Sequence, residues 1–249
     1  MANHFPLRLV GSRMLAPSVR HLEFARDDGL PLDFIPGQFI QVHFNYPDGT
    51  ATKRSYSLAT VHDHALGPGE AVEIAVSYVA GGAATALFTA LDEGQQIQAS
   101  GPYGRFCLGA ADANKRYLLI GTGTGVTPYR AMLPQLRQLM AARNVEVVLL
   151  FGARTPEELI YGEDFYAFAA ENPGFRFVPC FSRELPSDPH DDVRRGYVQD
   201  ALAEFAPDAI GDVAYLCGNP NMVDAAFEVL KTAGLPVPHI RREKYVSSK

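Results

Sequence analysis

A glycine-rich segment, Gly121-Thr-Gly-Thr-Gly125, stands between an apolar run and a helix-like pattern. The apolar run covers residues 116–120, and the helical pattern starts at Tyr129. Glycines let the backbone approach a ligand closely, and a helix N-terminus offers free N–H groups and the positive end of the helix dipole. The order of strand, turn and helix therefore predicts a dinucleotide-binding loop made by Gly121, Thr122, Gly123, Thr124 and Gly125.

The sequence of this loop departs from the usual Rossmann fingerprint, because Val126 stands where a third glycine is expected. From Gly123 to Pro128 the loop reads G-x-G-x-x-P. A proline in the first helical turn costs little, since the N–H that it lacks would have had no partner. Taken alone, the loop is also compatible with a simple glycine turn between a strand and a helix.

Two further segments in the first half of the chain have residue types that suit an anionic ligand. Alternation along a strand at 54–57 puts Arg54 and Tyr56 on one face and Ser57 on the other, although a solvated arginine on an ordinary strand is the alternative. Gly81-Gly-Ala-Ala-Thr85 leads into a predicted helix at 83–91, whose N-terminus could bind a second anion. Thr85 could equally be a structural helix cap.

The composition limits the classes of function. The chain has 249 residues, a net charge of −6 and no apolar run of membrane-spanning length, which predicts a soluble cytoplasmic protein that binds neither nucleic acid nor membrane. Its three cysteines are widely spaced, which argues against a disulfide framework, a zinc site or an iron–sulfur cluster. We therefore expect no metal site, and any redox chemistry must use an organic cofactor.

The elements that would position these segments change in character along the chain. The first part contains short alternating segments separated by turns, which predicts an antiparallel barrel or sandwich with strands at 19–24, 39–44, 54–58, 72–77 and 96–99. The second part alternates strands with helices, which predicts a parallel sheet with strands at 117–120, 145–151, 175–181 and 213–216 and helices at 132–143, 164–171 and 221–233. We place the boundary between two domains, 1–109 and 110–249, in the segment 109–114.

Six motifs, in their order along the chain, resemble those of the ferredoxin–NADP reductase family, bacterial type. The resemblance runs from Pro36-Gly-Gln-Phe39 to the end of the chain. It rests on R-x-Y-S at 54–57, the glycine-led helix at 81–85, G-P-x-G-x-F at 101–106, the loop at 123–128, Cys217-Gly-Asn-Pro220 and Glu243-Lys-Tyr245.

This resemblance implies an N-terminal flavin-binding antiparallel β-barrel and a C-terminal Rossmann-like α/β domain that binds NADP(H). It implies that Arg54 pairs with the flavin phosphate, that Tyr56 packs on the isoalloxazine and that Ser57 hydrogen-bonds near N5. Gly82, Ala83, Ala84 and Thr85 are implied to hold the phosphate or pyrophosphate. FAD is implied rather than FMN.

The resemblance also implies catalytic roles for Ser57 and for three residues late in the chain. Tyr245 is implied to cover the flavin face and to swing aside for nicotinamide, Glu243 to stabilise reduced flavin or relay a proton, and Cys217 to approach the reacting carbon. A small buried core residue is the alternative for Cys217. Val246 stands where related reductases often have a second aromatic against the FAD adenine, so the adenine contact is not predicted.

A preference for NADPH requires cationic groups for the 2′-phosphate. The candidates lie at the carboxyl ends of predicted strands, where open α/β sheets bind ligands. They are Ser182 and Arg183, then Arg195 with Tyr197 for the adenine, and Arg154 as a third arginine, all assigned by resemblance.

We therefore expect a monomeric reductase that transfers electrons between NADPH and ferredoxin or flavodoxin. The basic run Arg241-Arg-Glu-Lys244 could steer such an acidic carrier, or it could be a solubilising tail. An NADPH-dependent free-flavin reductase and a non-catalytic flavin electron-transfer subunit are the alternatives. The reductase of an oxygenase system usually has a fused iron–sulfur domain, which this sequence lacks.

Overall fold

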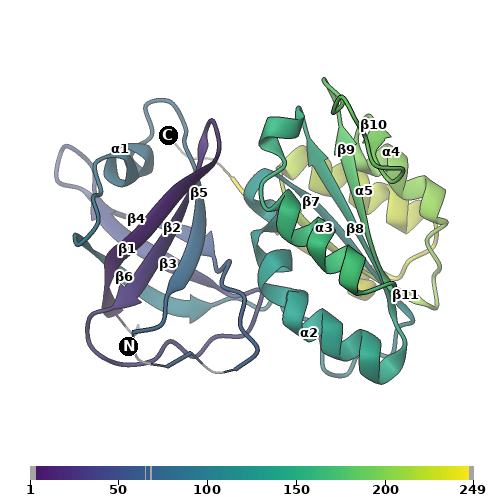
Figure 1. The fold of residues 1–249 in the computed structure, drawn as a ribbon, viewed down its shortest axis with the longest axis horizontal. Helices are drawn as coiled ribbons and strands as arrows, with labels where there is room; N and C mark the ends of the chain where they lie inside the picture. Colours follow the sequence, from purple (N-terminus) through teal and green to yellow (C-terminus); the bar gives the residue numbers. More distant parts are fainter. Residues whose placement is uncertain (1–3, 65, 68, 247–249) are drawn as a thin grey trace. The chain divides into compact units, whose positions relative to one another are not determined.

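The computed structural model describes residues 4–64, 66–67 and 69–246, which form two compact units (Figure 1). The first unit contains the described residues up to Cys107 together with Thr127–Met132. The second contains Leu108–Val126 and Leu133–Val246. Each unit is built on one six-stranded sheet. In the described part of the chain, no helix is long and apolar enough to cross a membrane.

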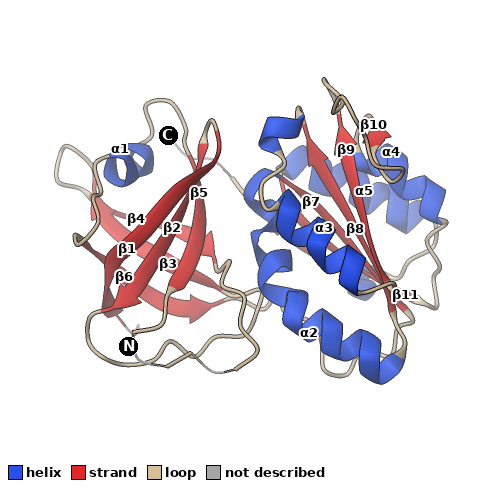
Figure 2. Cartoon of the chain, in the orientation of Figure 1, coloured by secondary structure: helices blue, strands red, loops and turns tan. Residues whose placement is uncertain are grey.

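The first unit is an antiparallel barrel with strand order β4-β3-β6-β1-β2-β5 (Figure 2). Its strands are β1 His4–Ala16, β2 Val19–Arg26, β3 Phe39–Asn45, β4 Ala51–Ser57, β5 Val72–Ser77 and β6 Gln96–Tyr103. An isolated antiparallel bridge between Leu58 and Ile74 joins the end of β4 to β5, the strand at the other edge. The bridge closes the sheet on itself, as the sequence predicts for this half.

Alternation along the barrel strands directs apolar side chains into one core. In β1, for example, Phe5, Leu7 and Leu9 are buried, whereas the residues between them are partly exposed. Helix α1, Ala83–Thr89, contributes Phe88 to the same core. It is two residues shorter than the predicted helix at 83–91.

Two glycines hold the P-G-Q-F segment against the G-P-x-G-x-F segment. Gly37 has φ +102°, and a Cβ on it would lie 2.1 Å from the Phe106 carbonyl oxygen. Gly104 has φ +104°, and a Cβ there would lie 3.0 Å from the Phe39 ring. Only glycine fits both positions, so the two motifs, more than sixty residues apart, form one packed unit.

The second unit has a fully parallel sheet in the order β10-β9-β8-β7-β11-β12, with helices on both faces (Figure 2). Its strands are β7 Arg116–Thr122, β8 Glu146–Ala153, β9 Phe175–Phe181, β10 Arg194–Arg195, β11 Asp212–Gly218 and β12 Ile240–Lys244. Its helices are α2 Thr127–Arg143, which begins in the first unit, α3 Gly162–Glu171, α4 Val198–Leu202 and α5 Pro220–Thr232. The four central strands are almost continuously buried, as expected for a parallel sheet covered on both sides.

All the predicted strands are present, but the sequence analysis missed β1, β10, β12 and helix α4. Pro6 and Gly11 interrupt the pattern of β1 and hide its alternation of Phe5, Leu7 and Leu9. The run at 241–244 is highly charged and reads as a tail, yet it pairs in parallel with β11 as an edge strand. An edge strand with one face open to solvent accepts such charges.

Candidate cofactor-binding site

Arg54 on β4 has a guanidinium group surrounded by neutral partners. Its Nη1 donates to Thr52 Oγ1 and to the Lys53 carbonyl oxygen, both at 2.9 Å, and its Nη2 donates to the Tyr46 hydroxyl at 2.8 Å. Its guanidinium carbon lies 5.9 Å from the centroid of the Phe44 ring. No carboxylate in the described part of the chain forms an ion pair with Arg54. Its charge is therefore not neutralised, which suits a phosphate ligand.

Tyr56 lies on the same face of β4 as Arg54, and Ser57 lies on the other face, as alternation predicts. The Tyr56 ring makes an edge-on contact with Phe88 of α1, with the centroids 5.3 Å apart. Burial raises the pKa of the Tyr56 phenol above its ordinary value, so the group stays protonated at neutral pH. Ser57 is buried. The face with Arg54 and Tyr56 therefore combines a cation with an aromatic ring, which are the groups that a flavin phosphate and ring require.

Thr85 closes the loop before α1 and does not cap the helix. Its Oγ1 accepts a hydrogen bond from the Val79 N–H at 2.8 Å, and the N-cap residue of α1 is Gly82, which has no side chain to cap with. Gly81 has φ +73°, which turns the chain into the helix. Ala83 and Ala84 form its first turn, where backbone N–H groups have no partner within the helix.

The glycine loop packs against the end of β11. Gly121 is paired with Cys217 in the parallel register, and a Cβ on Gly125 would lie 2.3 Å from the Cys217 carbonyl oxygen. Gly218 has φ +124°, and a Cβ on it would lie 2.5 Å from the Thr122 carbonyl oxygen. The loop itself is a 3₁₀ turn, Gly123–Val126, and α2 follows with its proline in the first turn, as predicted. Two motifs almost a hundred residues apart thus meet at the carboxyl edge of the sheet, where such folds bind nucleotides.

Cys217, Glu243 and Tyr245 form a cluster at this edge. Cys217 pairs with Glu243 across β11 and β12, the Tyr245 N–H donates to the Gly218 carbonyl oxygen at 2.8 Å, and the Tyr245 side chain is hydrogen-bonded to the Cys217 thiol. Burial, reinforced by the charge of Glu243, raises the pKa of the Cys217 thiol well above its ordinary value. Cys217 is therefore a neutral thiol and not a nucleophilic thiolate.

Glu243 has a carboxyl group suited to proton transfer near neutral pH. Burial raises the pKa of this carboxyl to about 7. No side chain in the described part of the chain donates a hydrogen bond to it or pairs with it. A carboxyl group in this condition can hold or release a proton at physiological pH.

The candidates for the 2′-phosphate lie at the ends of β8 and β9. The Ser182 N–H donates to the Ala153 carbonyl oxygen at 3.1 Å, and the Arg183 N–H donates to the Arg154 carbonyl oxygen at 3.0 Å. Arg183 is exposed, and in the described part of the chain it forms no ion pair. Arg154, in contrast, forms a two-pronged ion pair with Glu158, with Arg154 Nε 2.9 Å from Glu158 Oε2. The structure therefore puts Ser182, Arg183 and Arg154 together, but it shows Arg154 already engaged.

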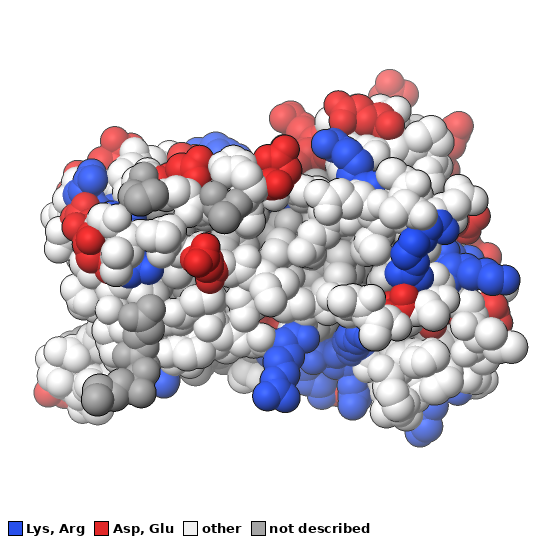
Figure 3. Space-filling model, turned by 90° about the horizontal axis from the view of Figure 1, so that it is seen from below, with Lys and Arg blue, Asp and Glu red and all other residues white. Residues whose placement is uncertain are grey.

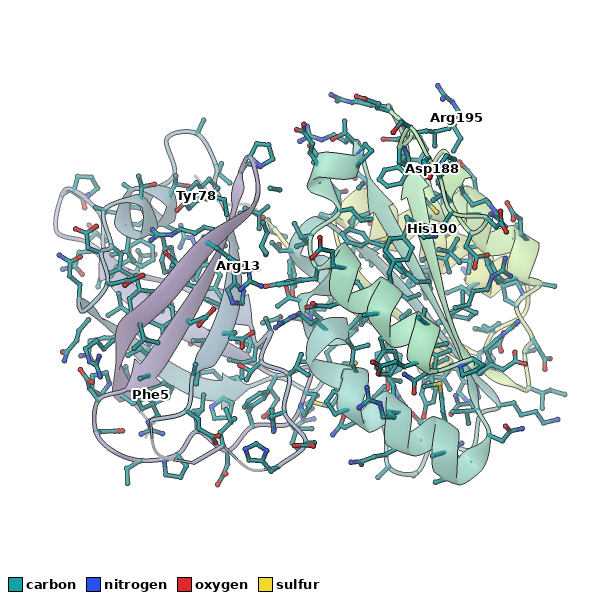
Figure 4. The ribbon with its side chains drawn as sticks, in the orientation of Figure 1. Phe5, Arg13, Tyr78, Asp188, His190 and Arg195 are labelled. Atoms are coloured by element: carbon teal, nitrogen blue, oxygen red, sulfur yellow. The ribbon has the colours of Figure 1, made fainter. Side chains whose placement is uncertain are left out.

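Arg195 and Tyr197 complete this edge of the sheet. Arg195 pairs with Phe181 in the register of β10 and β9, and Figure 4 shows its side chain extending outward from the end of β10. Tyr197 has 60% of its surface exposed, which is high for a tyrosine. No ion pair with Arg195 occurs among the described residues. An uncompensated arginine beside an exposed aromatic ring suits a phosphate beside an adenine.

The basic run at 241–244 lies in β12 and its cations have local partners, so steering of an acidic carrier stays a prediction. Arg241 is paired with Asp112, Arg242 lies 4.0 Å from the centroid of the Phe227 ring, and Lys244 Nζ is 2.7 Å from Asp224. Each cation is engaged within its own unit. Figure 3 shows Lys and Arg side chains in several separate groups on the face that it draws.

Each unit matches a known domain family. Residues 6–107 match the oxidoreductase FAD-binding domain, and residues 119–228 match the oxidoreductase NAD-binding domain. A protein named ferredoxin–NADP reductase B, from Sorangium cellulosum, is 35% identical over 251 residues, with 98% of each chain covered. The chain belongs to the ferredoxin–NADP reductase family. It is an FAD- and nicotinamide-binding flavoprotein oxidoreductase.

Other members of this family include reductase components of oxygenase systems. The reductase subunit of an aromatic O-demethylase from Amycolatopsis is 35% identical over 221 residues, which cover 86% of this chain but only 62% of that protein. A cytochrome P450 reductase structure from Amycolatopsis has 32% identity and a TM-score of 0.82, with 98% of this chain and 70% of that one covered. A ferredoxin–NADP reductase structure from Neisseria gonorrhoeae, 21% identical, has a TM-score of 0.81, covers 98% and 99%, and shows the common fold.

The sequence analysis missed two residues that hold candidate site residues in place. Glu158 follows Arg154 by four residues, a spacing that favours an ion pair, and Asp112 is paired with Arg241 at the start of β12. The spacing of Arg154 and Glu158 is visible in the sequence. Nothing local signals the pairing of Asp112 with Arg241, because 129 residues separate them.

Proposed function

We propose that this flavoprotein is an NADPH-dependent ferredoxin or flavodoxin reductase, the activity of EC 1.18.1.2. The observation that supports NADPH over NADH is the group of Ser182, Arg183 and Arg195 at neighbouring strand ends. Both arginines are exposed, and neither forms an ion pair among the described residues. The full-length similarity to a ferredoxin–NADP reductase supports a ferredoxin-type carrier.

In this proposal Arg54 holds the FAD phosphate, Tyr56 packs on the flavin ring and Ser57 hydrogen-bonds near N5. Gly82 leads the chain into this turn, with its N–H donating to the Val79 carbonyl oxygen, and Ala83, Ala84 and Thr85 hold the phosphates through backbone N–H groups and the Thr85 hydroxyl. When bound, FAD supplies the ability to take a hydride from NADPH and to pass the electrons on one at a time.

The remaining site residues of the chain act around this chemistry. Gly121, Thr122, Gly123, Thr124 and Gly125 receive the nicotinamide nucleotide, and Tyr197 packs on its adenine. The neutral Cys217 thiol lies beside the reacting carbon without attacking it. Glu243 holds or releases a proton, since its pKa is about 7, and Tyr245 moves aside to admit the nicotinamide.

An anaerobic titration of the purified protein with NADPH and separately with NADH tests this proposal. We expect a yellow protein that NADPH bleaches at least about tenfold faster than NADH, because only NADPH carries the 2′-phosphate. Arg183→Ala should remove this preference and leave the NADH rate nearly unchanged. Equal losses with both nucleotides would show that Arg183 does not bind the 2′-phosphate.

A reductase component that serves an oxygenase is the second candidate, since such proteins are 31–35% identical to most of this chain. The chain spans about three fifths of the length of these relatives. Reduction of purified ferredoxin, flavodoxin and an oxygenase in parallel assays separates the two candidates. Loss of flavin on gel filtration would instead indicate a free-flavin reductase, and a yellow protein that no nucleotide reduces would indicate an electron-transfer subunit. We further propose a cytoplasmic monomer.

A further inference from the structure

Glu158 is an acidic residue that pairs with Arg154, one of the arginines predicted to bind the 2′-phosphate. It ends a short 3₁₀ turn, Pro156–Glu158, that follows β8 directly. Its Oε2 accepts hydrogen bonds from the Arg154 N–H at 3.1 Å and from Arg154 Nε at 2.9 Å, and its Oε1 pairs with Arg154 Nη2. One edge of the Arg154 guanidinium, Nε and Nη2, therefore faces Glu158, whose side chain is only 27% exposed.

The Glu158 carboxylate also interacts electrostatically with a second arginine, Arg183. The Arg183 N–H and the Glu184 N–H both donate to the Arg154 carbonyl oxygen, at 3.0 and 3.1 Å, so Arg154 and Arg183 are tied together through their backbones. Although burial opposes it, Arg154 and then Arg183 hold the pKa of Glu158 below its ordinary value. Glu158 is thus ionised at neutral pH and interacts with both arginines.

From this arrangement we infer that Glu158 is a specificity-determining residue, which opposes the 2′-phosphate by occupying Arg154 and adding a negative charge beside Arg183. The inference rests on the proposed function, in which Arg183 receives the 2′-phosphate end of the nucleotide and Arg154 lies beside it. A dianionic phosphate entering this group must compete with the carboxylate for Arg154 and is repelled by it. A 2′-hydroxyl carries no charge and meets neither penalty.

The test compares binding of adenosine 2′,5′-diphosphate and of 5′-AMP to the FAD-loaded protein by calorimetry at low salt. These probes differ only in the 2′-phosphate. Glu158→Gln should raise the ratio of the two affinities by about fivefold or more, and added salt should reduce the gain. Glu157→Gln removes the same charge one residue away, from an exposed side chain, and should change the ratio less than about twofold.

An unchanged or lower ratio in Glu158→Gln would overturn the inference, as would an equal gain in Glu157→Gln. Arg154→Leu provides a reverse test that does not depend on the folding of the first variant, because it leaves the Glu158 charge without its partner. It should lower the ratio, and an unchanged ratio would contradict the inference. If wild-type protein prefers NADH, the proposed NADPH preference fails, yet the change in ratio between variants still decides the role of Glu158.

Discussion

The α-carbon of Gly125 faces the backbone carbonyl of Cys217 so closely that a Cβ on Gly125 would lie 2.3 Å from the Cys217 oxygen. This approach joins the glycine loop to the strand end that carries the cysteine. Backbone atoms cannot yield as a flexible side chain does, so any larger residue must push β11 and the loop apart. The glycine loop and the candidate catalytic thiol are therefore parts of one rigid packing unit.

We predict that Gly125→Ala destabilises the protein by about 2–4 kcal/mol and abolishes reduction by NADPH. Gly123→Ala is the matched control, because Gly123 has φ +53° but no atom within 4 Å of an added Cβ, so its cost is about 1 kcal/mol. Urea unfolding of both variants measures the difference. Equal stabilities would contradict the contact with Cys217.

Arg54 provides the second prediction. Its guanidinium has only neutral partners among the described residues, so Arg54→Ala should weaken FAD binding by about tenfold or more while changing the melting temperature of the FAD-free protein little. Lys53→Ala is the control, since Lys53 is an exposed neighbour on the opposite face of β4. Flavin fluorescence on dilution measures release of the cofactor. Comparable release from both variants would exclude a specific role for Arg54.

Glu243 should make stability depend on pH. Its folded pKa of about 7 lies above its ordinary value of 4.5, so the folded protein binds the proton more tightly than the unfolded chain does. The stabilisation is complete below about pH 4.5 and is lost as the pH rises to about 7. Relative to Glu243→Gln, wild-type protein should therefore lose stability across this window, by at most about 3 kcal/mol.

Denaturant unfolding of both proteins at several pH values measures this loss. Glu228→Gln, at an exposed position on α5, serves as a control and should show no such trend. A stability difference between wild-type protein and Glu243→Gln that does not change between pH 4.5 and 8 would show that the Glu243 carboxyl is not perturbed.

The ion pair of Asp112 and Arg241 should hold β12 in register. Arg241 lies 4.9 Å from the centroid of the Tyr215 ring, and its hydrogen bonds to Asp112 raise the pKa of the guanidinium above its ordinary value. Asp112 and Arg241 are only 11% and 28% exposed, so removing either partner leaves a poorly solvated charge. Each single variant, Asp112→Asn or Arg241→Met, should cost about 1–3 kcal/mol, and the double variant less than their sum. Strict additivity would show that the pair does not couple.

A structural feature of this protein could be predicted from the sequence where it depends on residues that are neighbours in the chain. The alternation of β4, the loop at 121–125 and the two-domain order were predictable, because each depends on neighbours in the chain. β12 was not predictable, because its pairing with β11 decides its conformation and its charged residues resemble a tail. The pKa of Glu243 was equally hidden, since burial alone raises it and burial follows from the fold.

Local reading also misjudged the arginines and lysines. The sequence makes Arg183 the leading candidate for the 2′-phosphate, with Arg195 and Arg154 as further candidates, and it shows the run at 241–244 as a basic patch. The structure separates them by their partners: Arg154 faces Glu158, and Arg241 faces Asp112. These acidic partners decide which arginine can bind an anion. The partners are brought together by the fold, so counting charges along the sequence does not identify them.

The final prediction concerns Tyr245, whose side chain is hydrogen-bonded to the Cys217 thiol. If this ring occupies the place where nicotinamide reacts, it limits access until it moves aside. Removing the ring frees that place for either nucleotide. Tyr245→Ala should then raise the rate of reduction by NADH more than that by NADPH, while Tyr245→Phe, which loses the hydrogen bond but keeps the ring, should behave like wild-type protein with NADH. Stopped-flow reduction of the three proteins with both nucleotides measures these rates. If Tyr245→Phe and Tyr245→Ala change the NADH rate equally, the hydrogen bond to Cys217 is responsible and the ring does not cover the flavin.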